Sequence, residues 1–268
     1  MSYFMDFFII LRDIFRDRKM LWELSKNDFK ARFANSMLGI LWAYIQPLAT
    51  ILVFWYVFQV GLRSNDIKGL PFIVWYTPAF LIWTFFSDTL STMTNSIRDY
   101  SYLVRKVNFN ISLIPYVKLI SGCFVHLAFI GVIFFINFVY GIPVSIFNVQ
   151  VIYYFLCTVA LLSGVGMICA TATPFVGDIP NVVSVMLQIL FWATPIVWNP
   201  DILSSDVEKV MKLNPMYYIC IGYRDTFQGQ VWFWEKSETL LFWIGVSATI
   251  LIGGHLFRKM NKDFVDVL

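Results

Sequence analysis

Charged residues are scarce in this sequence. Of its 268 residues only 14% are Asp, Glu, Lys or Arg, whereas a soluble globular domain carries about a quarter. Hydrophobic residues make up 59% of the chain and aromatic residues 19%. The scarcity of charge excludes an ordinary soluble domain and predicts an all-α polytopic membrane protein.

Residues that hold metals or nucleotides are also scarce. The four cysteines lie in or beside apolar runs without zinc-ligand spacing, which indicates buried free thiols. His126 and His255 are isolated, and Cys123 adds only one further ligand beside His126. No segment matches the phosphate-binding pattern GxxxxGK followed by Ser or Thr. We expect no metal site, no catalytic residue and no cofactor in this chain, so another chain must bind any ATP that drives it.

Six apolar segments are long enough to cross a bilayer as helices, which takes about 20 residues. Fourteen of the twenty Lys and Arg residues lie before the first segment, around the loop between the second and third, or in the tail. These regions fall on one side of a six-span chain, and cytoplasmic loops are enriched in Lys and Arg. Both termini are therefore predicted to be cytoplasmic. The predicted spans cover residues 37–60, 71–94, 111–139, 149–173, 181–198 and 239–257.

The segments outside the spans differ in pattern. Residues 1–36 begin with large apolar side chains at helical spacing, interleaved with charges. This pattern predicts an amphipathic helix in the cytoplasmic interface, in contact with membrane lipids. Residues 199–238 form a long external loop, and residues 259–268 form a short cytoplasmic tail.

The second span changes character half-way. Residues 87–96 carry Ser, Asp, Thr or Asn at nearly every turn. Asp88 would cost several kcal/mol if it faced lipid, so this half must face protein or a hydrated cavity. Two interpretations stay open: hydrogen bonding between helices of a bundle, or one wall of a translocation path.

A short amphipathic segment, residues 97–112, follows the second span. Its apolar side chains are expected to form an exposed ridge framed by charges, which suits docking into the groove of a partner. The alternative is a helix that lies on the membrane. The residues predicted for this surface are Arg98, Asp99, Tyr102, Leu103, Val104, Arg105 and Lys106.

Two tryptophans lie too deep for the aromatic belts of a membrane protein. Trp83 lies about 18 Å into the second span, and Trp192 about 9 Å from the outer end of the fifth. A buried indole needs a partner for its N–H, so each ring either packs in the core against a carbonyl or stacks on sugars in a conduit. The predicted conduit residues are Tyr44, Phe80, Trp83, Asp88, Phe191 and Trp192.

The fifth span is expected to bend where it ends. Thr194-Pro195 interrupts the helix, because proline removes a backbone hydrogen bond. We interpret this point as a hinge between a conduit-lining helix and the external loop, with Trp198 as its anchor.

Three segments together resemble the permease subunits of ABC-2 type polysaccharide exporters. They are RFANSMLGILWAYIQP (32–47), FWATPIVW (191–198) and LNPMYYICIGYRDTF (213–227). Residues 55–65, 69–75 and 262–268 are most similar to teichoic acid export permeases within that family. One departure is Gly177 before Asp178, where many relatives have Arg. The matching residues are Arg32, Ser36, Leu38, Gly39, Trp42, Pro47, Pro195, Asn214, Pro215, Tyr223 and Arg224.

The resemblance implies the type V exporter fold in a bacterial cytoplasmic membrane. Residues 37–258 would form a six-span half-transporter, which pairs with a second copy of itself and with two ATPase subunits that bind ATP and magnesium. Residues 97–112 would be the coupling helix, and residues 199–238 a re-entrant helical hairpin at the exit. No nucleic acid partner is expected.

The resemblance also implies a lipid-linked polysaccharide as substrate, with wall teichoic acid as the first choice and O-antigen or capsular polysaccharide as the alternative. A drug or lipid exporter of the same architecture fits less well, because the chain has neither a large external domain nor a fused ATPase. A membrane-embedded transferase would need an acid or base beside Asp88, and no His or Glu lies near it in the sequence.

Overall fold

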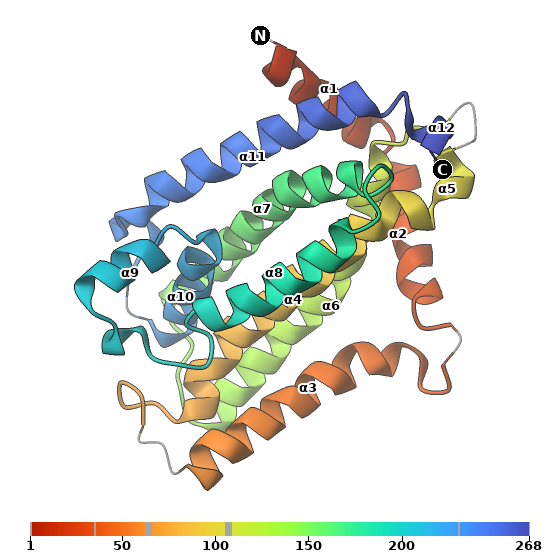
Figure 1. The fold of residues 1–268 in the computed structure, drawn as a ribbon. Helices are drawn as coiled ribbons and strands as arrows, with labels where there is room; N and C mark the ends of the chain where they lie inside the picture. The colour runs from red at the N-terminus through yellow and green to blue at the C-terminus, as the bar shows by residue number, and fades with distance from the viewer. Residues whose placement is uncertain (1, 35, 63–65, 105–108, 230, 268) are drawn as a thin grey trace.

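The computed structural model describes residues 2–34, 36–62, 66–104, 109–229 and 231–267, which contain helices and no strand. Figure 1 shows long helices packed side by side, as expected for an all-α membrane protein. A 3-10 turn and a π turn extend α3 to Gly39–Gly61. The helices are α1 (Ser2–Arg16), α2 (Arg18–Ala31), α3 (Trp42–Trp55), α4 (Phe72–Asp99), α5 (Ser101–Val104), α6 (Leu113–Val139), α7 (Gln150–Ala172), α8 (Ile179–Ala193), α9 (Ser205–Met211), α10 (Pro215–Gln228), α11 (Glu238–Met260) and α12 (Phe264–Val267).

Four helical segments of the described chain are long and apolar enough to cross a membrane: Gly39–Gly61, Leu113–Val139, Ile146–Ala172 and Glu238–Met260. The other two predicted spans correspond to α4 and α8. α8 has 15 residues, about 22 Å of helix, which is shorter than the apolar layer of about 30 Å. α4 is long enough, with 28 residues, but its Trp, Tyr, Thr and Ser residues make it less apolar. The six-span topology therefore stays a prediction.

The central helix of the bundle is α4. It packs against α6, α7, α8 and α10 (Figure 1), and most of its side chains are buried. Thr77 and Thr94 donate hydrogen bonds to backbone carbonyls four residues earlier, at 2.6 and 2.7 Å, which satisfies a hydroxyl within its own helix. Because protein rather than lipid surrounds α4, its polar residues are tolerated there.

Small residues bring α7 and α11 close together. A side chain at Gly253 of α11 would place its Cβ 2.8 Å from the carbonyl oxygen of Gly164 in α7. Glycine at both positions lets the two backbones meet, as is common between helices in membranes. The two helices run side by side in Figure 1.

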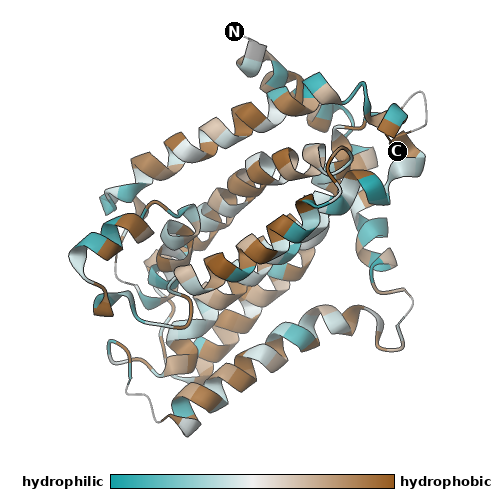
Figure 2. Ribbon diagram, viewed as in Figure 1, coloured by the Kyte–Doolittle hydropathy of each residue, from teal (hydrophilic) through white to brown (hydrophobic). Residues whose placement is uncertain are grey.

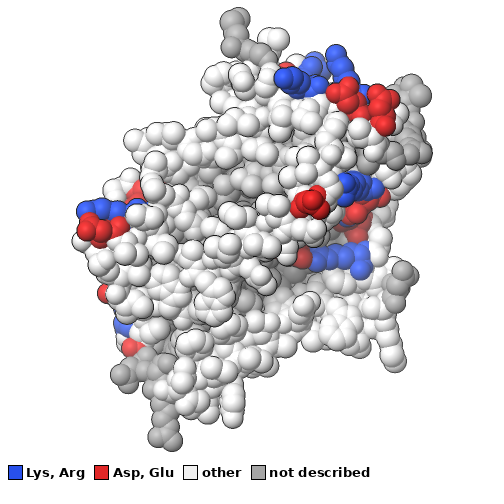
Figure 3. Space-filling model, viewed as in Figure 1, with Lys and Arg blue, Asp and Glu red and all other residues white. Residues whose placement is uncertain are grey.

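The two ends of the bundle are built differently. α1, α2, α5 and α12 gather at one end, and α9 and α10 lie at the other (Figure 1). The charged side chains visible in Figure 3 gather toward these ends, with a nearly uncharged band between them. Along that band α3, α8 and α11 are mostly hydrophobic (Figure 2). This distribution is that of a protein with an apolar layer around its middle.

The N-terminal region forms two helices rather than one. α1 packs on α11, where Asp6 contacts His255 at 2.8 Å and Arg258 at 3.1 Å, and α2 packs on α6. Ile10 is buried, whereas Phe4 and Phe8 are exposed. The predicted amphipathic character is therefore present in α1, which has one apolar side that the described residues do not cover.

Candidate functional site

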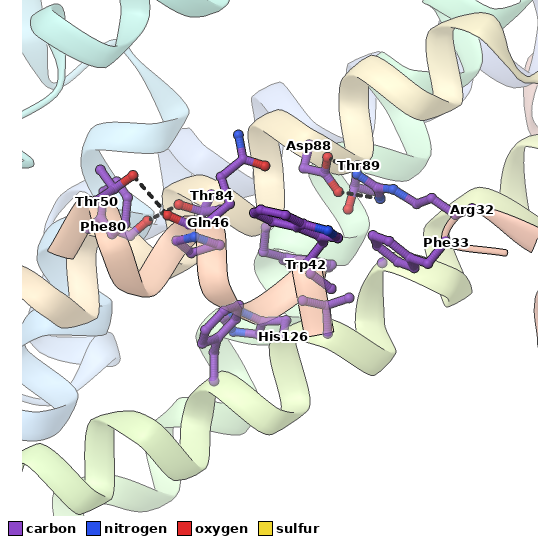
Figure 4. A pocket seen from close by; sticks show the side chains of 16 residues that line it. Arg32, Phe33, Trp42, Gln46, Thr50, Phe80, Thr84, Asp88, Thr89 and His126 are labelled. Atoms are coloured by element: carbon purple, nitrogen blue, oxygen red, sulfur yellow. Dashed lines mark hydrogen bonds and ion pairs between the residues drawn. The ribbon is translucent and has the colours of Figure 1, made fainter. Parts of the chain in front are cut away.

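A cavity of about 270 Å³ lies between α3, α4 and α6 (Figure 4). Aromatic side chains form part of its walls, with Trp42 from α3 and Phe80 from α4 among them. Polar side chains interrupt these walls, including Gln46 of α3 and Thr84 of α4. The cavity is thus a chamber of mixed polarity, in which aromatic surfaces alternate with polar and charged groups.

An ion pair closes one end of this cavity. Arg32, which directly follows α2, donates Nη1 to Oδ2 of Asp88 at 2.7 Å and Nη2 to Oδ1 at 2.5 Å. Such two-point contacts between guanidinium and carboxylate are the stronger kind of ion pair. Hydrogen bonding to Asp88 raises the pKa of Arg32 above its ordinary value. Figure 4 shows Arg32 reaching Asp88, with Phe33 beside it.

The pairing of Asp88 with Arg32 supports hydrogen bonding between elements of the bundle. Asp88 also lines the cavity, and its place in a translocation path stays a prediction. Its partner was not evident from the sequence, because Arg32 lies 56 residues away. The sequence singles out Arg32 only through the family resemblance.

The predicted conduit residues do not form one surface. Phe80 lines the cavity, and Tyr44 packs edge-to-face on an aromatic ring of α6 at 5.6 Å. Trp83 is only 5% exposed and contacts Phe191 edge-to-face at 5.9 Å. Trp192, in contrast, is 62% exposed. Here the prediction for Trp83 needs correction, because its ring packs behind Phe191 and has no free face for a sugar.

The exposed face of α8 carries a polar row that sequence reasoning missed. Asn181, Ser184 and Gln188 are exposed and follow one another at helical spacing, with Trp192 one turn further on. Leu187 is the one residue of α8 that the described chain buries. Amide groups cannot face hydrocarbon without losing their hydrogen bonds. This face of α8 must therefore meet water, polar ligand or another protein surface.

Arg224 of α10 joins three elements at the end of the bundle that holds α9. Only 3% of it is exposed. Its Nε donates to the carbonyl oxygen of Trp75 at 3.0 Å, and Nη2 donates to those of Pro195 and Ile196 at 2.8 and 3.2 Å. Its guanidinium also lies 3.5 Å from the centre of the Trp75 ring, a cation–π contact. We call this arrangement the Arg224 clamp.

α8 ends where the hinge was predicted. Thr194 is extended, with φ −100° and ψ 136°, as proline requires of the residue before it. Its Oγ1 accepts a hydrogen bond from Asn214 Nδ2 at 2.9 Å. Asn214 also caps α10 by accepting from the N–H of Met216 at 3.0 Å, and Pro215 occupies the first helical turn. Asn214 thus holds the chain at Thr194, and Arg224 holds it at Pro195 and Ile196.

The other residues that carry the family resemblance lie near the cavity. Arg32, Trp42 and Pro47 line it. Gly39 has φ +54°, in the left-handed region that glycine adopts most readily, and it begins the turn that leads into α3. Several resembling residues therefore fall into two groups, one at the cavity beside the middle of α4 and one near its start at Trp75.

The predicted coupling segment is more buried than expected. α4 continues to Asp99 and includes Arg98, and α5 has only four residues. Tyr102 is exposed, but Leu103 and Val104 are buried.

The expectation of an exposed apolar ridge is therefore wrong for Leu103 and Val104. Val104 belongs to a buried cluster with Phe257 of α11 and Phe264 of α12, and these residues come from the far end of the sequence. Arg105 and Lys106 lie outside the described residues.

An ionic cluster ties this end of α4 to its neighbours. Lys118 of α6 contacts Asp28 of α2 at 2.9 Å and Asp99 of α4 at 3.1 Å. Tyr100 donates its hydroxyl to Asp28 at 2.8 Å. A displacement of the end of α4 would therefore be transmitted to α2.

The histidines take structural positions. His126 is buried in α6, with Nε2 2.9 Å from the hydroxyl of Tyr223. Within the described residues no group of three or more His, Cys, Asp or Glu side chains could hold a metal ion. The cysteines are free, and Cys157 and Cys220 are buried.

Comparison with known proteins connects this architecture to a family. The model of the ABC-2 type transporter family matches residues 19–227. The chain belongs to this family. The O-antigen export system permease protein RfbA of Klebsiella pneumoniae is 26% identical over 258 residues, covering 93% of this chain and 95% of that protein. The protein of the same name from Myxococcus xanthus is 25% identical over 264 residues, covering 96% and 98%.

The matched range extends from α2 to α10 and includes both the cavity and the Arg224 clamp. As an ABC-2 permease, the chain is a multi-pass membrane protein and a transport subunit rather than a catalytic one. Membership implies an ATPase partner. The finer resemblance to teichoic acid permeases is not supported, because these relatives are O-antigen export permeases.

We predict that Arg224→Ala destabilises the protein more than any truncation of an exposed cation does. The change removes a donor from the carbonyl group of Trp75 and leaves those of Pro195 and Ile196, which lie outside any helix, without theirs. Each of the latter two losses costs about 1–3 kcal/mol. Thermal unfolding of the purified chain in detergent measures the effect. The matched control is Lys209→Ala, which removes an exposed cation of α9. Equal melting temperatures for the two variants would contradict a structural role for the clamp.

Proposed function

We propose that this chain is the membrane subunit of an ATP-driven exporter that moves a lipid-linked surface polysaccharide of the O-antigen type across the bacterial cytoplasmic membrane. Membership of the ABC-2 family supports transport. The O-antigen export permeases among its relatives support this polymer over wall teichoic acid, the first choice from sequence resemblance.

The main structural support for this proposal is the exposed face of α8. Gln188 and Asn181 present amide groups, Ser184 a hydroxyl and Trp192 an indole ring, on a helix whose other residues are apolar. Amides can hydrogen-bond sugar hydroxyls, and an aromatic ring can cover the apolar face of a sugar. Neither contact demands one particular monosaccharide, so the surface suits a repeating polymer.

A second copy of the chain would complete the conduit. α3 buries only Ile51 within the described chain and exposes large side chains on much of its surface, such as Trp42, Leu52 and Tyr56. If two copies meet at α3 and α8, the apolar residues pack between them and the polar row of α8 borders the space that they enclose. Opening would separate the copies along these two helices.

The ATPase subunits would dock at the end of the bundle that holds α5. Tyr102 and Arg98 are exposed there, and the ATPases would bind ATP and magnesium. Asp99 follows Arg98 and contacts Lys118, so movement of the docked segment reaches α6 and α2. This orientation places both termini in the cytoplasm.

We predict that Trp192→Ala lowers export roughly tenfold, the loss expected for one aromatic contact with the substrate. The matched control is Trp234→Ala, because Trp234 is 60% exposed but lies outside α8. Surface polymer is measured against the amount of chain in the membrane. Normal export by the Trp192 variant, or an equal loss in the control, would contradict stacking on α8.

Trp83→Ala is a poor test of the same idea. Its ring is buried, and removing a buried Trp costs about 3–5 kcal/mol, so reduced export by this variant would reflect folding.

Depletion of the chain tests which polymer is exported. We expect a lipid-linked polysaccharide to accumulate on the cytoplasmic side, with a repeating unit made of sugars. Mass spectrometry of the accumulated lipid fraction gives the ratio of sugar to phosphate. One phosphate per repeat with a polyol would overturn the choice of O-antigen in favour of teichoic acid, and no accumulated polymer would overturn polysaccharide export.

A further inference from the structure

The cavity beside α3 has one charged end and one end lined by an aromatic ring and neutral polar groups (Figure 4). Asp88 lies at the end closed by Arg32. Phe80 lies eight residues earlier in α4, about 12 Å along the helix, and Phe129 of α6 lines the wall as well. Thr50 and Gln46 lie near Phe80 (Figure 4), so this end is uncharged rather than purely apolar. The volume of about 270 Å³ has room for a lipid head group beside Arg32 but not for acyl chains.

The charges at the charged end are mixed in sign. Arg32 also lines a neighbouring cavity, together with Asp28, Asp99 and Lys118. With Asp88 included, the two cavities place two cations next to three carboxylates. A purely anionic head group would add charge to a region that already has an excess of carboxylates. A zwitterionic head group adds none, and it offers a partner to each sign.

We propose that this cavity binds the head group of one zwitterionic phospholipid with a primary amine, of the phosphatidylethanolamine class, whose acyl chains lie outside the cavity. Arg32 holds the phosphate with the N–H groups that Asp88 leaves unused, since a guanidinium has five. The ammonium group of the lipid donates to Asp88. A choline head group has no N–H to donate, so it binds more weakly.

Thr89 supplies a further polar contact inside the cavity. Its side chain lines the cavity and is only 1% exposed, and its hydroxyl oxygen has no hydrogen-bond partner within the described chain. An ester oxygen of the lipid is a suitable acceptor for this hydroxyl. Gly122 of α6 leaves the space that the hydroxyl occupies, because a Cβ there would overlap it.

A bound lipid would fasten α3 to the bundle. Only Ile51 of α3 is buried by the described chain, and α3 forms one wall of the cavity. The lipid would therefore act as packing material between α3 and the pair α4 and α6. This inference depends on the membrane location of the chain and not on the export of a polysaccharide. A negative result for lipid binding therefore leaves the proposed function untouched, and the reverse also holds.

The test is lipid retention by the full-length chain, purified in mild detergent and examined by native mass spectrometry. Phosphatidylethanolamine, phosphatidylglycerol and phosphatidylcholine with identical acyl chains are added in equal amounts. We expect one phosphatidylethanolamine to remain bound, with about tenfold preference over each competitor. Equal or stronger retention of phosphatidylglycerol, or retention of no lipid, would overturn the proposal.

Two pairs of variants separate binding from folding. Arg32→Gln with Asp88→Asn removes both charges at the charged end and should reduce retention about tenfold. Its control is Asp206→Asn with Lys209→Gln, which removes an exposed ion pair of α9. Gly122→Ala should reduce retention without any change in charge, whereas Gly131→Ala in the same helix has open space around it. Unchanged retention in both cavity variants would place the lipid elsewhere.

Discussion

A polar group within the apolar layer of a membrane must find a partner in the protein or in water, and the arrangement of this chain depends on that requirement. Thr77 and Thr94 meet it within their own helix. Asp88 meets it through Arg32. The amides of α8 have no such cover from the described chain. Where the described chain supplies the partner, the contact is a fixed point of the fold. The exposed amides of α8 lack such a partner, and they form the surface that we propose for transport.

The fixed points lie at the two ends of α4. At one end the Arg224 clamp holds the start of α4 and the residues after α8. At the other end Lys118 and Arg32 hold the polar half of α4 to α2, α6 and the entry into α3. α4 itself is buried and continuous. It can therefore transmit a displacement from the α5 end to the α9 end, which an ATP-driven exporter needs.

The sequence predicts the long helices well, because an apolar run is a local signal. The third and fourth spans were expected at 111–139 and 149–173 and are found at Leu113–Val139 and Gln150–Ala172. Span five is shorter than expected, since proline ends α8 at Ala193. The break at Thr194 was also predicted, but the residues that hold it were not.

Pairings between distant segments could not be predicted. Nothing local connects Asp88 with Arg32, or Val104 with Phe264. The depth of a residue along a helix does not tell whether its side chain faces the bundle or the outside. Trp83 and Trp192 therefore have the same interpretation from the sequence, although Trp83 is buried and Trp192 exposed. The polar row of α8, in contrast, was readable from its spacing.

Water access to α8 tests the central claim most directly. Gln188→Cys and Met186→Cys are compared in the assembled exporter, with the four native cysteines replaced by alanine, because these positions lie on nearly opposite faces of the helix. A charged maleimide that cannot cross the membrane is applied from each side. We predict rapid labelling at position 188 and little at position 186. Equal labelling at both positions, or labelling of position 186 alone, would contradict a water-lined path along α8.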